Sequence, residues 1–129
     1  MTNKNKIIPK TLPTLTLSSI EEATKVYAVL QAANINSIEV TLRPSVSDEA
    51  IEFLANQPEI NLGLGTVLNV TQLLKFKSLN ICYAVSPGFN EDVHDYCKQE
   101  EITYIPGVET ASEVMKMMSF GLDRLKFFP

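Results

Sequence analysis

Short apolar, strand-like runs recur along the chain, beginning near positions 12, 37, 61, 81, 103 and 124, so that successive starts lie 25, 24, 20, 22 and 21 residues apart. Helix-like segments lie between these runs. Strands that alternate with helices at this spacing predict βα units, in which right-handed crossovers join parallel strands. A period this regular limits the chain to an α/β fold built on a parallel sheet.

Helix N-termini are marked by capping side chains. Three of the starts have a polar residue followed three positions later by Glu or Gln, the pattern of a capping box: Ser19 with Glu22, Asn69 with Gln72, and Thr110 with Glu113. Ser47 and Asn90 each precede two acidic residues, which the helix dipole favours in a first turn. Gly121 stands where the last helix is expected to end.

Composition fits one globular domain over residues 1–129, because 45% of the residues are hydrophobic and 20% are charged. A net charge of −4 gives no electrostatic reason to bind nucleic acid or an anionic membrane. The chain has no apolar run of about 18 residues, and its start lacks the apolar stretch of a signal peptide, so we expect a cytoplasmic protein. Cys82 and Cys97 have no metal-ligand spacing and are expected to be reduced core thiols.

Two parallel-sheet architectures compete at this length. A doubly wound open sheet of five or six strands fits 129 residues, whereas a complete (β/α)8 barrel needs about 200 or more. The last strand-like run, 125–129, has no helix after it to cover its apolar face. That ending looks like an interrupted barrel.

The run 38–43 alternates strictly, so its apolar positions face the helices, while Glu39, Thr41 and Arg43 share the other face. An acid and an arginine on a buried face are costly unless they serve each other or a ligand. In a barrel that face points inward, and Arg43 would lie near the mouth at the carboxyl ends of the strands. An edge strand with one solvated face is the alternative interpretation.

Lys126 poses the same question near the other end of the chain, because it alternates with Leu125 and Phe127 and shares a face with Phe128. Removing an ammonium group from water favours the free amine, which can attack a carbonyl carbon. Such chemistry needs a proton carrier, and Glu39 is the one acid within a strand-like run. The alternative is an ordinary solvated lysine.

Glycine and proline pairs follow several strands. The G-x-G of 63–65 allows close approach to a ligand and lets Thr66 offer a hydroxyl, but it lacks the third glycine of a dinucleotide fingerprint. Pro-Gly turns at 87–88 and 106–107 are expected to end two further strands. His94 is interpreted as a surface histidine on an acidic helix, which argues against Ser/His hydrolysis.

Five ordered segments resemble the bacterial 2-keto-3-deoxy-6-phosphogluconate (KDPG) aldolases, which also cleave 4-hydroxy-2-oxoglutarate: EVTLR at 39–43, GLGTVL at 63–68, SPG at 86–88, IPG at 105–107 and KFFP at 126–129. The resemblance implies a (β/α)8 TIM-type barrel with about its first six strands present, a homotrimer, and a class I aldolase that uses no metal or other cofactor. Substrate and product would be a small 2-keto acid and pyruvate.

The same resemblance implies a role for each matching residue. Lys126 would form the Schiff base, and Glu39 would be the general acid and base. Arg43 and Thr66 would hold the carboxylate of the pyruvyl portion. Pro87 and Phe128 would line the pocket.

Three features depart from the family pattern. Pro44 follows the arginine where Thr or Ser is common, and residues 34–36 replace a glycine-rich turn before the second strand. The seventh and eighth strands, which carry the family's phosphate-binding residues, are missing. We therefore expect weak binding of a phosphorylated substrate, and self-association through open sheet edges. An inert barrel fragment and a small open-sheet ligand-binding module remain alternatives to an active aldolase.

Overall fold

A computed structural model describes residues 9–129, and the N-terminal residues 1–8, on which the signal-peptide expectation partly rests, lie outside the described residues. The elements alternate as β1 (Thr14–Leu15), α1 (Ile20–Ala32), β2 (Ser37–Thr41), α2 (Asp48–Ala55), β3 (Asn61–Gly65), α3 (Val70–Leu74), β4 (Ile81–Ser86), α4 (Glu91–Gln99), β5 (Thr103–Val108), α5 (Ala111–Ser119) and β6 (Lys126–Phe127). Within residues 9–129, no helix is long and apolar enough to cross a membrane.

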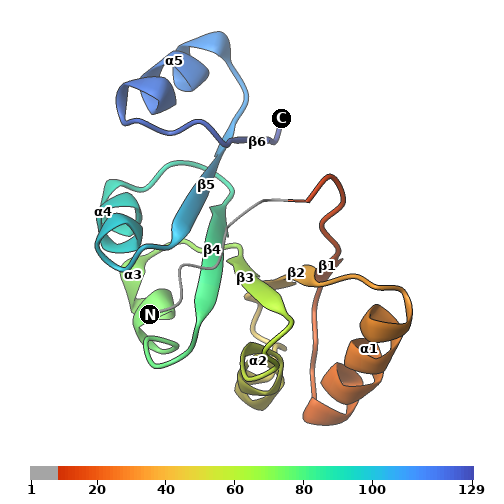
Figure 1. Cartoon of the computed structure of the whole chain (residues 1–129). Helices are drawn as coiled ribbons and strands as arrows, with labels where there is room; N and C mark the ends of the chain where they lie inside the picture. The colour runs from red at the N-terminus through yellow and green to blue at the C-terminus, as the bar shows by residue number, and fades with distance from the viewer. Residues whose placement is uncertain (1–8) are drawn as a thin grey trace.

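The strands form one parallel sheet whose spatial order, β1-β2-β3-β4-β5-β6, follows the chain. A doubly wound sheet would reverse its strand order at a switch point, and this sheet does not. The sheet curls, and the helices lie along its outer side (Figure 1). The fold is therefore a partial barrel of the TIM type, and the open-sheet architecture is wrong.

Local capping decides where the helices begin. Ser19, Ser47 and Asn90 each accept a backbone N–H from the first turn of the helix that follows. Full capping boxes form at α3 and α5, where the capping side chain and the Glu or Gln three residues later satisfy each other's backbone N–H. Gly121 adopts a φ of 79° just past α5. The helix starts predicted from the sequence are confirmed.

The larger core lies between the sheet and its outer helices. Ile38, Val40, Leu62 and Leu64 are fully buried on the outer face of β2 and β3. Four residues of α2 pack in the same core, and a T-shaped pair of Tyr27 and Phe53 rings, with centroids 5.8 Å apart, joins α1 to α2. This core fixes the two central strands and therefore the side chains on their opposite face.

A smaller cluster occupies the inner face of the sheet: Cys82, Tyr83, Val85 and Ile105, with Leu12 against them. Cys82 is here and Cys97 is in the outer core, and both are buried and free of disulfides. The inner face is thus packed with apolar side chains along β4 and β5, and Glu39 of β2 and Lys126 of β6 add charged groups to it.

One turn prediction is wrong. Pro106 and Gly107 lie inside β5, which continues to Val108 and pairs Pro106 with Ser86 of β4. Gly107 permits close passage of the neighbouring strand end, because a Cβ there would overlap the backbone carbonyl of Pro87. The Pro-Gly pair at 87–88 does follow the end of β4, as expected.

Candidate active site

Sheet register brings Glu39 and Lys126 to the same inner face, although 86 positions of sequence separate them. Glu39 pairs with Gly63, which pairs with Tyr83, which pairs with Thr103. Side chains alternate along a strand, so Gly107 shares the face of Thr103. Gly107 pairs with Lys126, so Lys126 and Glu39 lie on the same face of the sheet, as predicted.

Glu39 is a buried acid, with only 7% of its surface exposed. Burial raises the pKa of the Glu39 carboxyl above its usual range, and the positive charge of Lys126 lowers it in part. The ammonium group of Lys126 also lies over the ring of Phe128, 4.2 Å from its centroid. An acid that can hold a proton and an amine therefore share one side of the sheet.

Two glycines of β3 make this inner face possible. A Cβ on Gly63 would overlap the ring of Tyr83, and a Cβ on Gly65 would overlap the Glu39 carboxyl. Both glycines lie within the strand, and side chains of neighbouring strands fill the space above them. The sequence interpretation, in which the glycines allow a ligand to approach, does not describe these contacts.

Tyr83 is a residue of the inner face that sequence reasoning missed. Its hydroxyl lies 3.1 Å from the carbonyl oxygens of both Ile38 and Asn61, so it ties β4 to β2 and β3. Burial raises the pKa of the Tyr83 phenol, which stays protonated and able to donate. The signal in the sequence was the glycine at 63, because a bare inner position on one strand leaves room for a large ring on the next.

Thr66 follows β3 in a strained backbone conformation, with a φ of 55°. A β-branched residue rarely adopts the left-handed region, and such strain is typical of functional sites. The next residues are held by β4: Val67 donates its N–H to Val85 O at 3.0 Å, and Ser86 Oγ donates to Val67 O at 2.5 Å. Thr66 is half-buried and follows directly on the carboxyl end of β3.

Arg43 is not at an inward strand position, so that part of the prediction is wrong. β2 ends at Thr41, although Leu42 still donates its N–H to Gly65 O at 2.9 Å. Arg43 is exposed at the rim and lines a hollow of about 400 Å³ between the loops that follow β2 and β3. Pro44 lies in a turn that begins only after β2 has ended, so the alternation of β2 does not extend to Arg43.

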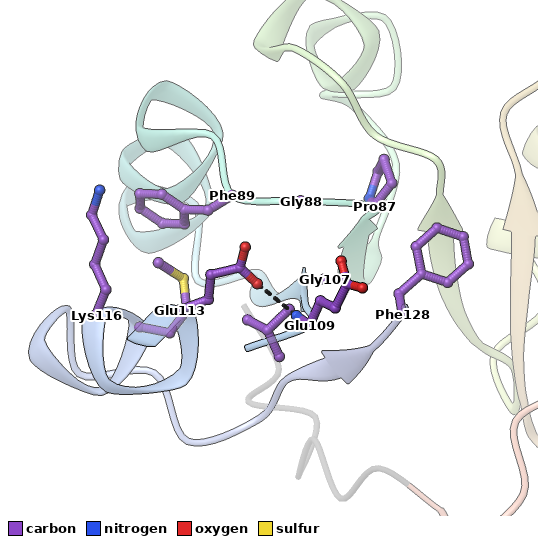
Figure 2. A pocket seen from close by; sticks show the side chains of 10 residues that line it. Pro87, Gly88, Phe89, Gly107, Glu109, Glu113, Lys116 and Phe128 are labelled. Atoms are coloured by element: carbon purple, nitrogen blue, oxygen red, sulfur yellow. Dashed lines mark hydrogen bonds between the residues drawn. The ribbon is translucent and has the colours of Figure 1, made fainter. Parts of the chain in front are cut away.

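Pro87 and Phe128 lie at one end of a pocket of about 280 Å³ at the carboxyl ends of β4 and β5 (Figure 2). Phe128 is 51% exposed and continues the β6 ladder by donating its N–H to Val108 O. Two acids lie in the same pocket, where Glu113 of α5 accepts the backbone N–H of Glu109. The structure thus brings Pro87 and Phe128 together, and the stacking of Lys126 on Phe128 connects them to the inner face.

His94 is buried, so the prediction of a surface histidine is wrong. Its ring contacts those of Phe89, Phe120 and Tyr104, with centroids 5.4 to 6.4 Å away, and its Nδ1 lies 3.2 Å from Asp95 Oδ1. The position is three residues before the buried Cys97, one turn along the same face of α4. Its aromatic surroundings make it a packing residue. Among residues 9–129, no three His, Cys, Asp or Glu side chains gather as a metal site.

The family assignment rests on the amino-acid sequence. Residues 3–129 match the model of the aldolase family described as KDPG and KHG aldolase. The chain belongs to that family. KHG denotes 2-keto-4-hydroxyglutarate, another name for 4-hydroxy-2-oxoglutarate. The resemblance noted in the sequence is therefore confirmed at the level of the family.

Curated relatives of the chain are named as aldolases of this family. The chain is 35% identical over 121 residues to the 2-dehydro-3-deoxy-phosphogluconate aldolase of Treponema pallidum, an alignment that covers 93% of this chain and 58% of the relative. It is 36% identical over 119 residues to the KHG/KDPG aldolase of Escherichia coli, covering 92% of this chain and 56% of the relative. The chain therefore spans less than two thirds of the length of these relatives.

Solved structures agree with the fold. A KDPG aldolase from Legionella pneumophila, with pyruvate captured at low pH as a covalent carbinolamine intermediate, superposes with a TM-score of 0.82 at 34% identity. The match covers 92% of this chain and 58% of that one. A KDPG aldolase from Zymomonas mobilis matches with a TM-score of 0.80 at 36% identity, covering 92% of this chain and 57% of that one.

Proposed function

We propose that this chain carries the imine-forming part of a class I aldolase site, which cleaves 2-keto-3-deoxy-6-phosphogluconate to pyruvate and glyceraldehyde 3-phosphate. One observation carries the proposal: a buried acid with a raised pKa and a lysine whose charge acts on it share the inner face of the sheet. Amine and proton carrier are the two groups that imine chemistry needs.

Lys126 begins the reaction as the nucleophile. Its amine attacks the C2 carbonyl carbon, and the carbinolamine loses water to form an iminium ion. Glu39 then takes the proton of the C4 hydroxyl, the C3–C4 bond breaks, and its electron pair moves into the iminium. The aldehyde leaves, Glu39 returns the proton to C3 of the enamine, and water releases pyruvate from Lys126.

The environment of Glu39 suits both directions of proton transfer. A carboxyl with an ordinary pKa is a weak acid catalyst at neutral pH because almost all of it is ionised. Burial raises the pKa of Glu39, while Lys126 opposes the rise and keeps the ionised form accessible. The formation of a positively charged iminium on Lys126 preserves that opposing charge during the step in which Glu39 acts as a base.

The remaining residues would bind and orient the substrate. Arg43 at the rim and the Thr66 hydroxyl would hold the carboxylate at C1, since a guanidinium is well suited to a carboxylate. Phe128, beneath the Lys126 amine, and Pro87 would form an apolar wall beside the pyruvyl carbons. These roles are supported by the positions of the side chains at the carboxyl ends of the strands.

The family name supports a second substrate, 4-hydroxy-2-oxoglutarate, which would give pyruvate and glyoxylate by the same steps. We propose that the protein acts in the cytoplasm as a homotrimer. Sedimentation velocity on the purified chain measures the assembly, and a single species of any other size contradicts the trimer.

The direct test measures the release of pyruvate from each of the two substrates with a coupled lactate dehydrogenase assay. We expect release by the wild-type chain and none by Lys126→Met. Lys25→Met is the matched control, because Lys25 is an exposed lysine on α1, and it should retain the wild-type rate. A folded wild-type chain that releases no pyruvate from either substrate contradicts the proposed function and favours an inert fragment.

A further inference from the structure

The inner face of β3 is bare at both of its last inward positions, and each gap is filled differently. Tyr83 lies over Gly63, and the Glu39 carboxyl lies over Gly65. A Cβ on Gly65 would overlap Glu39 Oε1 and lie 2.7 Å from Cδ and 3.0 Å from Cγ. Real Cβ atoms essentially never come within 3.0 Å of another heavy atom. The Glu39 carboxyl can therefore occupy its position because residue 65 has no Cβ.

The position of the Glu39 carboxyl is not set by the pairing of its backbone. In the strand register Glu39 is opposite Gly63, and Thr41 is opposite Gly65. The side chain therefore leans along the strand direction, toward the carboxyl end of the sheet, and crosses to the neighbouring strand. The Tyr83 ring occupies the alternative space over Gly63. The ring thus fills the space over Gly63, and the bare backbone of Gly65 leaves room for the carboxyl.

We infer that Gly65 is a positioning residue: its bare backbone holds the Glu39 carboxyl at the place on the inner face from which it moves protons for the substrate bound to Lys126. This role rests on the proposed function, in which Glu39 is the proton carrier. A methyl group on Gly65 displaces the carboxyl while every chemical group of the site remains. Misplacing a catalytic group by about 1 Å can cost about 100-fold in rate.

The experiment separates proton transfer from imine formation. In D₂O, the methyl protons of pyruvate exchange with solvent only if a proton is removed from C3 of the iminium. ¹H NMR measures the rate of this exchange. Borohydride trapping of pyruvate measures the imine itself. In Gly65→Ala we expect trapping on Lys126 to persist and methyl exchange to fall about 100-fold. Exchange at the wild-type rate in Gly65→Ala overturns the inference.

Shortening the side chain at position 39 distinguishes a positioning role of Gly65 from a purely structural one. Asp in place of Glu39 withdraws the carboxyl from the added methyl group, so Gly65→Ala combined with Glu39→Asp should exchange faster than Gly65→Ala alone, although Glu39→Asp alone is slower than wild type. No recovery in the double variant contradicts a positioning role.

Leu64→Val controls for lost stability. Leu64 is fully buried on the opposite face of the same strand and does not contact the site. We expect this variant to melt at a lower temperature yet to exchange pyruvate methyl protons at the wild-type rate while folded. Equal losses of exchange in Leu64→Val and Gly65→Ala would mean that general damage to β3 is responsible, which overturns the inference.

A readout independent of catalysis distinguishes this inference from the proposed function. The ¹³C carboxyl signal of Glu39, assigned by its loss in Glu39→Gln, reports the pKa of that group. Displacement toward water or toward Lys126 lowers the raised pKa, so Gly65→Ala should titrate at lower pH than wild type. An unchanged titration overturns the positioning role, whereas absent pyruvate trapping in the wild-type chain overturns only the proposed function.

Discussion

Helices α2 and α5 are similar in length and each has an N-cap side chain bonded to its first turn, yet they pack very differently. The eight residues of α2 bury four side chains, and Leu54 is wholly inaccessible. The nine residues of α5 bury only Met117, while Met115 is 71% and Met118 is 64% exposed. Local signals therefore decide that a helix forms, and its neighbours decide how much of it is buried.

The candidate active site joins these two unequal regions. Glu39 projects from β2, which is buried along its whole length, whereas Lys126 projects from the two-residue strand β6 that follows α5. The acid is thus fixed by the central core, and the lysine is carried by a sparsely packed unit. Elements with few buried contacts open at lower free-energy cost. Differences in stability between the regions bear directly on whether the two groups stay together.

Truncating a large side chain in each of the two helices should give the largest contrast. Leu54→Ala removes a fully buried side chain from α2 and should lower the free energy of unfolding by about 2–5 kcal/mol. Met118→Ala on α5 should change it by less than about 0.5 kcal/mol, because that side chain is mostly exposed. Urea denaturation measures both. Equal losses would mean that α5 is packed as tightly as α2.

Removing the α5 cap should give an intermediate effect. The Thr110 hydroxyl accepts the Glu113 N–H at 3.2 Å, and little tertiary packing supports the helix. Thr110→Ala should cost about 1 kcal/mol. Amide hydrogen exchange should show the loss within α5, with β2 and β3 unaffected. A uniform loss of protection across the sheet would contradict the independence of the two regions.

The smallest effect is on the pH dependence of stability. The pKa of Glu39 is raised in the folded protein above its ordinary value of 4.5, so the folded state binds this proton more tightly than the unfolded state. The favourable contribution is complete below pH 4.5 and is lost as pH rises through the folded pKa. The free energy of unfolding of Glu39→Gln, relative to wild type, should therefore increase with pH across this window. A pH-independent difference would contradict the raised pKa.

The sequence predicts most of the fold because strand period and capping are local. The four longest strands begin where their apolar runs begin, at Ser37, Asn61, Ile81 and Thr103. Strict alternation also puts Glu39 and Lys126 on one face once a barrel is assumed. The contacts between strands are harder to anticipate, since the fit of Tyr83 over Gly63 depends on which two strands become neighbours.

The errors have the same physical origin. The ring of His94 packs against Phe120, which lies just past α5 and is a neighbour that the sequence of α4 does not identify. Pro106 was expected to end a strand, but pairing with Ser86 of β4 continues it. Arg43 lies two residues beyond the end of β2, so the predicted alternation was carried past the last residue of the strand. Tertiary neighbours overrode local signals in the first two cases.

Borohydride trapping with pyruvate, followed by intact mass and peptide mapping, tests most directly whether Lys126 is the reactive amine of this chain. We predict one reduced pyruvyl adduct, mapped to Lys126, which Lys126→Met loses and Lys25→Met retains. No adduct on a folded wild-type chain, or an adduct on another lysine, would contradict an organised imine-forming site on the inner face of the sheet.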